Sequence, residues 1–446
     1  MIMLKGTVRT IFLIAFCLFC VLPLGAQNEA YNSYSPYSMF GIGDISKQGS
    51  AYNKSMGGVG IATRDKRALN YLNPASVTAR DPKSFMADFS LAQGNRYYKQ
   101  GDMHSSNNTF NIYDVAFSFP VYKSLAMYAG FSPFSDIGYK ITSKETGSII
   151  SNTGVITNTV QGYGGMSEAF LGAGLTLFKG FSIGAEGQYY FGKLNKNSTF
   201  DLASTGYRDI YSGYEMHLKS YSGKFGVQYE TPSIGNVTAV LGATYRLKSN
   251  LSGFVDRYEI QTISSINDST PSPRTFTDTL GLHNKVGLSQ EIGVGFALRG
   301  GKWTAEVDYL RSDWSSCGLD KVPGFATVGS AVFSASAAQS VRAGFSYVPN
   351  RNDIRYYRRR VTYRAGAYWD QAYYKVDGNS INAFGLTFGA TLPVFSNRTG
   401  VTNGLTLGVD IGQRGSTAGN LVRERYINFN IGLNLLDIWF LKPRYD

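Results

Sequence analysis

The sequence predicts an all-β membrane protein, an antiparallel outer-membrane β-barrel of about fourteen strands. Three observations support this fold class. Many stretches alternate apolar with polar or small residues at a period of two, an export signal stands at the N-terminus, and no later apolar run is long enough to span lipid as a helix. A water-soluble sheet would also alternate, but the signal and the number of such stretches favour a closed barrel, which leaves no strand edge unpaired in lipid.

Residues 1–26 are expected to be a signal peptide. Lys5 and Arg9 form a positive start, Ile11–Leu22 is apolar but short for a membrane span, and small residues precede a cleavage site before Gln27. The mature protein would then enter the outer membrane of a Gram-negative cell. Cleavage leaves Cys317 as a single thiol, so no internal disulfide is expected.

The composition fits one large closed domain in a membrane. The 31 tyrosines and 28 phenylalanines suit aromatic girdles at the two membrane surfaces, and the 51 glycines suit close strand packing. No proline- or serine-rich linker divides the chain. The formal net charge of +12 fits contact with anionic outer-membrane lipid and lipopolysaccharide, or merely basic loops; nucleic acid is not an expected partner of an exported barrel.

Residues 84–446 supply the predicted barrel strands. Short joints such as Lys179–Gly180 follow even-numbered strands, whereas the long joints 134–166, 252–284 and 312–338 follow odd-numbered ones. Short turns belong on the periplasmic side, so both termini are expected in the periplasm. The predicted strands are Ser84–Gln93, Phe110–Phe119, Leu125–Pro133, Ser167–Phe178, Phe181–Lys193, Tyr214–Glu230, Val237–Leu251, Lys285–Leu298, Lys302–Arg311, Gln339–Val348, Val361–Tyr373, Ile381–Leu392, Asn403–Gln413 and Glu424–Leu436.

The last strand shows the alternation most clearly. Ile427, Phe429, Ile431 and Leu433 share a face that is predicted to contact lipid, and Asn430 lies on the opposite face. The inward faces carry charges of both signs. Either these charges form a salt-bridged interior that holds a plug, or they form a lane for substrate headgroups. The predicted inward residues are Glu186, Gln188, Lys224, Gln228, Arg246, Glu291, Glu306, Asp308, Arg342, Arg364 and Asp410.

Residues 27–83 lack sustained alternation and are the predicted hatch, a plug inside the lumen. They contain the glycine-rich stretch Ser55–Ala62 and the triplet Asn73-Pro74-Ala75, and the barrel region adds Gly130–Phe134 and Arg342–Tyr347. With these motifs the chain resembles the FadL/TodX family of outer-membrane long-chain fatty-acid and hydrocarbon transporters. The segments Ser35–Asp44 and Tyr356–Arg360 depart from the family pattern, which places the chain in a divergent branch.

The resemblance implies transport of a hydrophobic or amphipathic small molecule by passive diffusion, with lateral exit into the bilayer near the third strand. Exit into lipid spares an apolar solute about 0.8 kcal/mol per methylene that would otherwise meet water. Pro133 would disrupt strand pairing there, although it is also compatible with a simple strand end, and Asn73-Pro74 with a simple turn. The implied hatch and gate residues are Asn73, Pro74, Ala75, Phe131, Pro133 and Phe134, and Phe40 and Ile42 are the expected apolar ligand contacts.

Catalysis is not expected. The sequence has only three histidines, His104, His217 and His283, without a nucleophile at meaningful spacing, and it shows no metal or cofactor motif. The alternative function is a plugged barrel that serves as a structural or docking component of an outer-membrane assembly or protein-export machine. The basic joint Arg351–Arg360 and the loop at 252–284 are its possible protein contacts, and an interior without a continuous apolar pocket would favour it. A monomer is expected, and the substrate stays open.

Overall fold

The computed structural model describes residues 33–81, 83–122, 124–145, 156–202, 208–263, 274–283, 285–325, 332–396, 402–417 and 421–438. All of them belong to one compact unit, Tyr31–Asp446. The predicted signal peptide, residues 1–26, lies outside the described residues.

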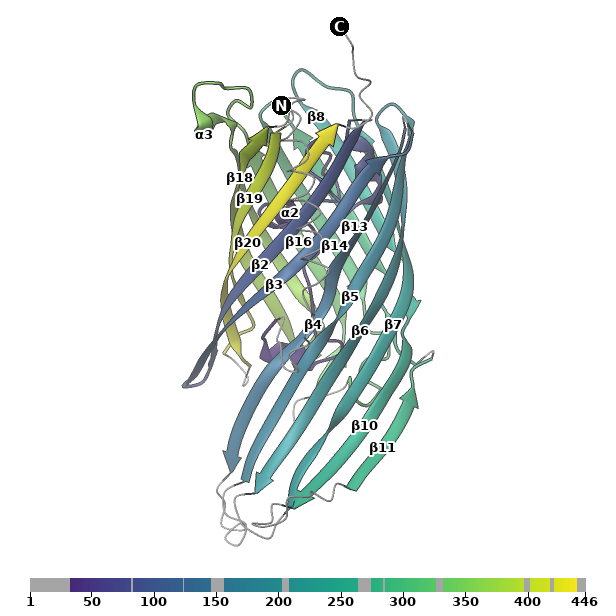
Figure 1. The fold of residues 1–446 in the computed structure, drawn as a ribbon, viewed down its shortest axis with the longest axis vertical. Coiled ribbons are helices and arrows are strands. Elements are labelled where there is room, and N and C mark those ends of the chain that lie inside the picture. The colour runs from purple at the N-terminus through teal and green to yellow at the C-terminus, as the bar shows by residue number, and fades with distance from the viewer. Residues whose placement is uncertain are drawn as a thin grey trace, which may run out of the picture. The chain divides into compact units, whose positions relative to one another are not determined.

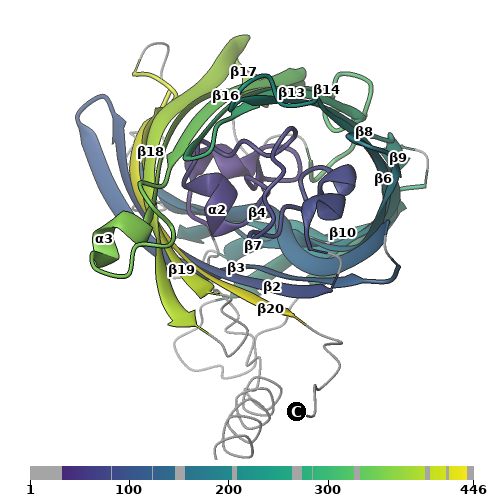
Figure 2. The same cartoon turned by 90° about the horizontal axis from the view of Figure 1, so that it is seen from above.

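In the described part of the chain, fourteen antiparallel strands form a closed barrel (Figures 1 and 2). Each strand pairs with the next around the ring, and the last pairs with the first through Ser84 opposite Ile438. The predicted fold class is therefore confirmed, and each predicted strand range overlaps one of the fourteen barrel strands. The strands are β2 (Ser84–Gln100), β3 (Met103–Pro120), β4 (Leu125–Glu145), β5 (Ile156–Phe178), β6 (Phe181–Leu202), β7 (Arg208–Glu230), β8 (Thr238–Arg246), β13 (Glu291–Arg299), β14 (Trp303–Asp313), β16 (Ala337–Tyr347), β17 (Thr362–Val376), β18 (Asn379–Ser396), β19 (Thr402–Arg414) and β20 (Arg423–Ile438).

The two faces of the wall follow the alternation in the sequence. On β20, Ile427, Phe429 and Ile431 are exposed on the outside, whereas Tyr426 and Asn430 are buried on the inside. Successive side chains of a strand point to opposite faces, so one register places every second residue toward lipid. The same rule produces an apolar outer belt around the barrel, with exposed side chains that include Phe225, Leu241, Val294, Val307 and Phe345.

Two of the three predicted long loops are wrong, because they are largely strand. The range 134–166 consists mainly of the far ends of β4 and β5, and the range 252–284 contains β10 (Ser252–Ile263) and β11 (Arg274–Gly281). In β4 the register shifts between Pro133 and Ser135, so Ile137 and Tyr139 are buried although they have the same parity as the exposed Phe131. One period of two therefore does not run through the whole strand. Among its described residues, the range 312–338 contains as strand only the end of β14, β15 (Phe333–Ala335) and the start of β16.

β10 continues the wall beyond β8 by pairing with β7, and β11 pairs with β10. β9 (Ser249–Asn250) and β12 (Gly287–Leu288) form a separate two-stranded sheet. The longer joint 349–360, at the end of the barrel with the short turns, carries the helix α3 (Tyr357–Arg360), which projects beside β18 (Figure 2). This end is called the short-turn end below. None of the described helices is long and apolar enough to cross a membrane.

Residues 33–81, called the N-terminal segment below, lie within the ring of strands (Figure 2). They form η1 (Pro36–Met39), β1 (Asp44–Ile45), α2 (Ala51–Lys54) and η2 (Pro74–Ala79). Gly57 has a positive φ of 74°, and a side chain there would lie 2.5 Å from the carbonyl oxygen of Ala343 on the wall. The glycine-rich stretch Ser55–Ala62 therefore passes against the wall at a distance that a larger residue would prevent.

The wall separates between β3 and β4 over part of its height. Their backbone pairing ends at Val115 opposite Phe131. Beyond that point β3 stays paired with β2 and β4 with β5, and the strands diverge (Figure 1). The short strand β1 pairs with Ser135 and Asp136 of β4, so the N-terminal segment occupies part of this gap.

Candidate functional site

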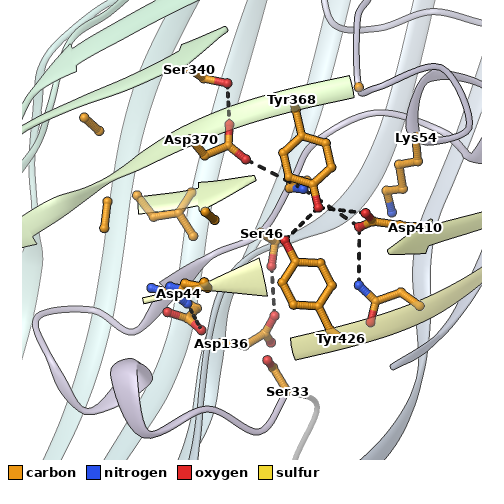
Figure 3. Close-up of a pocket in the computed structure, with 18 of the residues that line it drawn as sticks. Ser33, Asp44, Ser46, Lys54, Asp136, Ser340, Tyr368, Asp370, Asp410 and Tyr426 are labelled. Carbon is orange, nitrogen blue, oxygen red and sulfur yellow. Dashed lines mark hydrogen bonds and ion pairs between the residues drawn. The ribbon is translucent and has the colours of Figure 1, made fainter. Parts of the chain in front are cut away.

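A cavity of about 350 Å³ lies inside the barrel (Figure 3). Residues 44–58 of the N-terminal segment line it together with β2, β3 and β16–β20, and β4, β8, β13 and β14 contribute further residues. The strand period explains which side chains line it. Tyr368 and Asp370, two residues apart on β17, point inward together, and Ser340 on β16 lies directly opposite Asp370 and donates a hydrogen bond to it.

Asp410 is at the centre of the first polar network in this cavity (Figure 3). The Tyr368 hydroxyl donates to Asp410 Oδ1 over 2.7 Å and lies 2.7 Å from the Tyr426 hydroxyl. Lys47 Nζ stands 3.8 Å from Asp410 Oδ2 and 3.6 Å from Asp370 Oδ2, with the Tyr368 ring centroid 3.0 Å away. A cation of the N-terminal segment is thus held between two carboxylates of the wall.

A second polar network joins β1 to the wall. Arg414 Nη1 lies 2.8 Å from Asp44 Oδ2, and Arg96 Nη1 lies 3.7 Å from both Asp44 Oδ2 and Glu424 Oε2. The Ser35 hydroxyl donates to Glu424. Removing one partner would leave a buried charge uncompensated, so these groups hold the segment in one position.

The N-terminal segment is also fixed through its backbone. Asp308 Oδ2 accepts hydrogen bonds from the N–H groups of Gly60 (2.7 Å) and Ile61 (2.9 Å), and Glu306 Oε1 accepts from Ala62 N–H (2.9 Å). The two carboxylates, two residues apart on β14, face the same side. Their contacts match the interpretation of the inward charges as groups that hold an inserted segment.

The charges of the cavity lining nearly balance. The volume falls in the range of small-molecule sites, but an apolar molecule here would remove water from charged groups without replacing their hydrogen bonds, which is unfavourable. Among the described lining residues six are acidic and seven basic: Asp44, Asp136, Glu291, Asp370, Asp410 and Glu424, and Lys47, Lys54, Arg96, Arg246, Arg311, Arg342 and Arg414.

The predicted ligand contacts do not line this cavity. Phe40 and Ile42 are buried in an apolar cluster, where the Phe40 ring lies 5.9 Å from Phe333 and 5.4 Å from Tyr374, centroid to centroid. Space next to them is already filled by side chains. A ligand contact at these two residues stays a prediction that requires the cluster to open.

The triplet Asn73-Pro74-Ala75 lies against β5–β7 rather than at the gap between β3 and β4. Asn73 Nδ2 donates to Val227 O over 3.2 Å, and its Oδ1 accepts from Ala75 N–H over 3.0 Å, which caps η2. A side chain at Gly226 would meet Asn73 Oδ1 at 2.0 Å. A role of this triplet in a lateral gate stays a prediction, and its contacts in this structure are with β5–β7.

The residues beside the gap come from a different part of the N-terminal segment. Gln48 Nε2 donates to Pro133 O over 2.9 Å, and the Ser132 hydroxyl donates to Gln48 Oε1 over 2.9 Å. Pro133 coincides with a register shift in the pairing of β4 with β5, but the strand continues beyond it. Phe131 is exposed on the outside, and Phe134 is buried in the lumen.

Sequence reasoning missed Lys47, Tyr368 and Tyr426 as members of the network. The last two share the inward parity of Arg364 and Asn430, so the strand period held enough information to place them on the inner face. Lys47 lies in an irregular segment, where no periodicity indicates its direction.

The described residues show no arrangement typical of a catalyst. They contain no group of three or more His, Cys, Asp or Glu residues that could hold a metal. His217 Nε2 lies 2.7 Å from Glu215 Oε1, two residues away on the same strand, and Cys317 is buried. These side chains are accounted for by local contacts.

Comparison with known proteins identifies both a family and a fold. A family model described as BamG matches residues 7–446. No curated protein matches the chain. Among solved structures, the toluene transporter TodX of Pseudomonas putida has a TM-score of 0.57 at 14% identity and covers 90% of this chain and 100% of its own. A FadL homologue of Pseudomonas aeruginosa has a TM-score of 0.55 at 9% identity, covering 90% and 100%. The toluene transporter TbuX of Ralstonia pickettii has a TM-score of 0.54 at 14% identity, covering 87% and 98%. At these identities the likeness establishes the FadL-type fold.

Proposed function

The chain belongs to the BamG family, and we propose that it acts as a docking component of an outer-membrane protein assembly, built on a barrel whose interior is closed by its own N-terminal segment. The observation that carries this proposal is the pairing of charges in the interior of the barrel. Charged groups of the segment and of the wall compensate one another across the cavity, so the lumen serves to hold the segment.

An apolar cargo fits this interior poorly. Each buried charge that loses its partner or its water costs several kcal/mol, which offsets the gain from several buried methylenes at about 0.8 kcal/mol each. Lys47, Arg96 and Arg414 would all have to lose contacts if a hydrocarbon took their place beside Asp44 and Asp410.

The outside of the barrel offers surface for a protein partner. The joint 349–360 carries five arginines, and Ile354, in the same joint, is fully exposed. An exposed aliphatic side chain among arginines is typical of a protein contact, in which apolar centres are surrounded by charges. On the opposite end, β4–β7, β10 and β11 extend one side of the wall (Figure 1).

Native mass spectrometry of the protein, gently extracted from its own membranes, tests this proposal. The expected result is a stoichiometric complex with at least one other protein and no bound apolar molecule. A matched pair of variants sharpens the test. Arg355→Gln/Arg358→Gln/Arg360→Gln should lower the yield of the complex, whereas Lys140→Gln/Lys144→Gln/Lys219→Gln, which removes three exposed charges elsewhere, should not. A lone barrel that carries an apolar ligand would contradict the proposal.

Passive transport of an amphipathic molecule with lateral exit is the second candidate, and the gap between β3 and β4 favours it. The wall has no backbone hydrogen bonds between these strands beyond Val115 and Phe131 among the described residues. The N-terminal segment would have to leave the gap for a molecule to pass. The whole chain shares its FadL-type fold with proteins described as a hydrocarbon channel and a toluene transporter.

A disulfide that locks the segment in the gap tests this second candidate. Ile45 and Ser135 are directly opposed in the β1–β4 pair, and opposed residues of an antiparallel pair have Cα atoms about 4.5–5.5 Å apart, within disulfide reach. Ile45→Cys/Ser135→Cys should take up a labelled fatty acid when reduced and lose uptake when oxidised if the route passes here. Equal uptake in both states, or none in either, removes this route.

A further inference from the structure

A second cavity, of about 220 Å³, opens at the short-turn end of the barrel. Its lining comes from the N-terminal segment at Tyr52 and Thr63–Arg67, from the β13–β14 hairpin at 299–304, and from the end of β16 and the following joint at 346–351. Part of the lining belongs to the N-terminal segment, which lies inside the ring. A lipid in the surrounding bilayer therefore does not reach this part of the cavity.

The second cavity is strongly basic. Arg64 Nε lies 3.0 Å from Glu230 Oε2, and Arg299 Nη1 lies 3.5 Å from Glu230 Oε1, so one carboxylate outside the lining is shared by two guanidinium groups. The acid of the lining, Asp65, accepts a hydrogen bond from Arg67 N–H over 2.9 Å. Among the described residues of the lining, six are basic and one is acidic: Arg64, Lys66, Arg67, Arg299, Lys302 and Arg351, and Asp65.

Four of these cations have no acidic partner. Within the described part of the chain, no ion pair is formed by Lys66, Arg67, Lys302 or Arg351. Unlike the large cavity, where the two signs nearly balance, this one has an uncompensated positive charge. A cavity of this sign raises the local concentration of anions and favours their binding.

Arg351 belongs both to the lining of this cavity and to the joint 349–360, so the positive surface continues along that joint. Asp353, the acid of this joint, is already used, because its carboxylate accepts from Arg355 N–H and Tyr356 N–H and lies 3.1 Å from Arg359 Nη1. Arg355 and Arg359 lie over the Tyr356 ring, with guanidinium carbons 5.2 and 4.8 Å from its centroid. The basic groups of the second cavity and of the joint 349–360 therefore cover a longer stretch of surface than one small anion can contact.

We propose that the second cavity and the joint 349–360 together bind an acidic peptide segment of a protein partner. This inference rests on the proposed docking function and gives the partner's contact a chemical class. A polypeptide with several Asp or Glu residues places carboxylates in the cavity and along the joint at the same time. A single phosphate fills the cavity but leaves the joint unpaired, and a bilayer lipid meets the joint but not the lining inside the ring.

Direct binding of a fluorescent ten-residue Asp/Glu peptide to the intact, detergent-solubilised protein tests the inference. Binding should weaken as salt rises from about 0.05 M to about 0.3 M, because screening reduces contacts between exposed charges. Lys66→Gln/Arg67→Gln/Lys302→Gln should weaken it about fivefold, since three exposed charge contacts, each weak alone, are lost together. The control is Lys140→Gln/Lys144→Gln/Lys219→Gln, which removes the same charge far from the site and should bind as the parent does. Heat-modifiability on gels checks that each variant is folded.

Three outcomes would overturn the inference. Equal weakening by both triple variants would mean that only bulk charge matters. Displacement of the peptide by inorganic phosphate alone, at equal concentration, would indicate a simple anion site. Binding to vesicles with phosphatidylglycerol but not to the peptide would indicate a lipid contact. A complex that persists in native mass spectrometry under any of these outcomes keeps the docking function and removes only this site.

Discussion

At the scale of single residues, the direction of a side chain decides its role in this barrel. On β20 the outward Phe429 meets lipid, and the inward Asn430 lines the large cavity. Adjacent positions therefore have opposite requirements: one needs an apolar side chain, and the other needs a polar one or free space. The same alternation of an outward apolar and an inward polar residue recurs at Val341 and Arg342 on β16 and at Asp410 and Ile411 on β19.

Phe429→Arg should destabilise the barrel by about 2–4 kcal/mol, because a charge near the middle of the lipid face must lose its water. Asn430→Arg should cost clearly less, since its side chain points into a cavity that already holds charged groups. Urea unfolding in lipid vesicles measures both variants. Equal destabilisation by the two substitutions would refute the assigned faces.

Gly226→Ala should loosen the N-terminal segment without dissolving the barrel. The added methyl group would stand 2.0 Å from Asn73 Oδ1 and would force the cap of η2 off β7. The expected readout is faster proteolysis within residues 33–81 while the strands stay resistant. Gly281→Ala is the matched control, because a side chain there would meet nothing within 4 Å. Unchanged proteolysis of the Gly226 variant would show that the contact does not hold the segment.

The sequence predicts which face a strand residue occupies but not its partner. The parity of β17 places Tyr368 and Asp370 inside because the strand period is fixed by covalent geometry. The contact of Tyr368 with Asp410 depends on the register of three strands, and that of Lys47 with both acids depends on an irregular segment. These are long-range choices that local periodicity does not encode.

At the scale of elements, the apolar belt defines how much of each strand can be recognised. The predicted third strand ends at Pro133, whereas β4 runs on to Glu145, because the register shift between Pro133 and Ser135 breaks the alternation at that point. The hydrogen bonds of β4 with β5 extend across this whole region. Strand ends that leave the membrane are thus read as loops from sequence alone.

The joint 349–360 is an element whose order depends on one carboxylate. Asp353→Ala should speed trypsin cleavage after the arginines of the joint, because the hydrogen bonds to Tyr356 N–H and Arg355 N–H are lost. Asp102→Ala, in the β2–β3 hairpin, is the control. No change in cleavage would show that Asp353 does not organise the joint.

Acid should likewise loosen the joint 349–360 in the parent protein and speed its cleavage. The hydrogen bond from Tyr356 N–H, together with Arg359, holds the pKa of Asp353 below its usual value of 3.8. A depressed pKa stabilises the ordered joint above the ordinary aspartate pKa, and this contribution is lost as the pH falls through the folded value. Cleavage by pepsin, which acts in acid, should therefore become equal in the parent and Asp353→Ala only at the lowest pH; a difference that persists unchanged there would contradict the assignment.

At the scale of the whole molecule, a FadL-type barrel has an interior that is occupied by the chain itself. The sequence predicts that residues 84–446 form a closed ring of strands and that the irregular residues 27–83 precede this ring in the chain. It does not predict the near balance of charges in the large cavity, which separates this interior from the apolar route that the family resemblance implies. The central claim is therefore that residues 33–81 close the lumen and leave the surface of the barrel for partners.

Planar-bilayer conductance tests this claim most directly. The intact protein should show no large steady pore, whereas deletion of residues 27–75 should open one. Glu306→Gln/Asp308→Asn, which weakens the anchors of Gly60–Ala62 without shortening the chain, should give intermittent openings. A large, steady pore in the intact protein, unchanged by the deletion, would contradict the account.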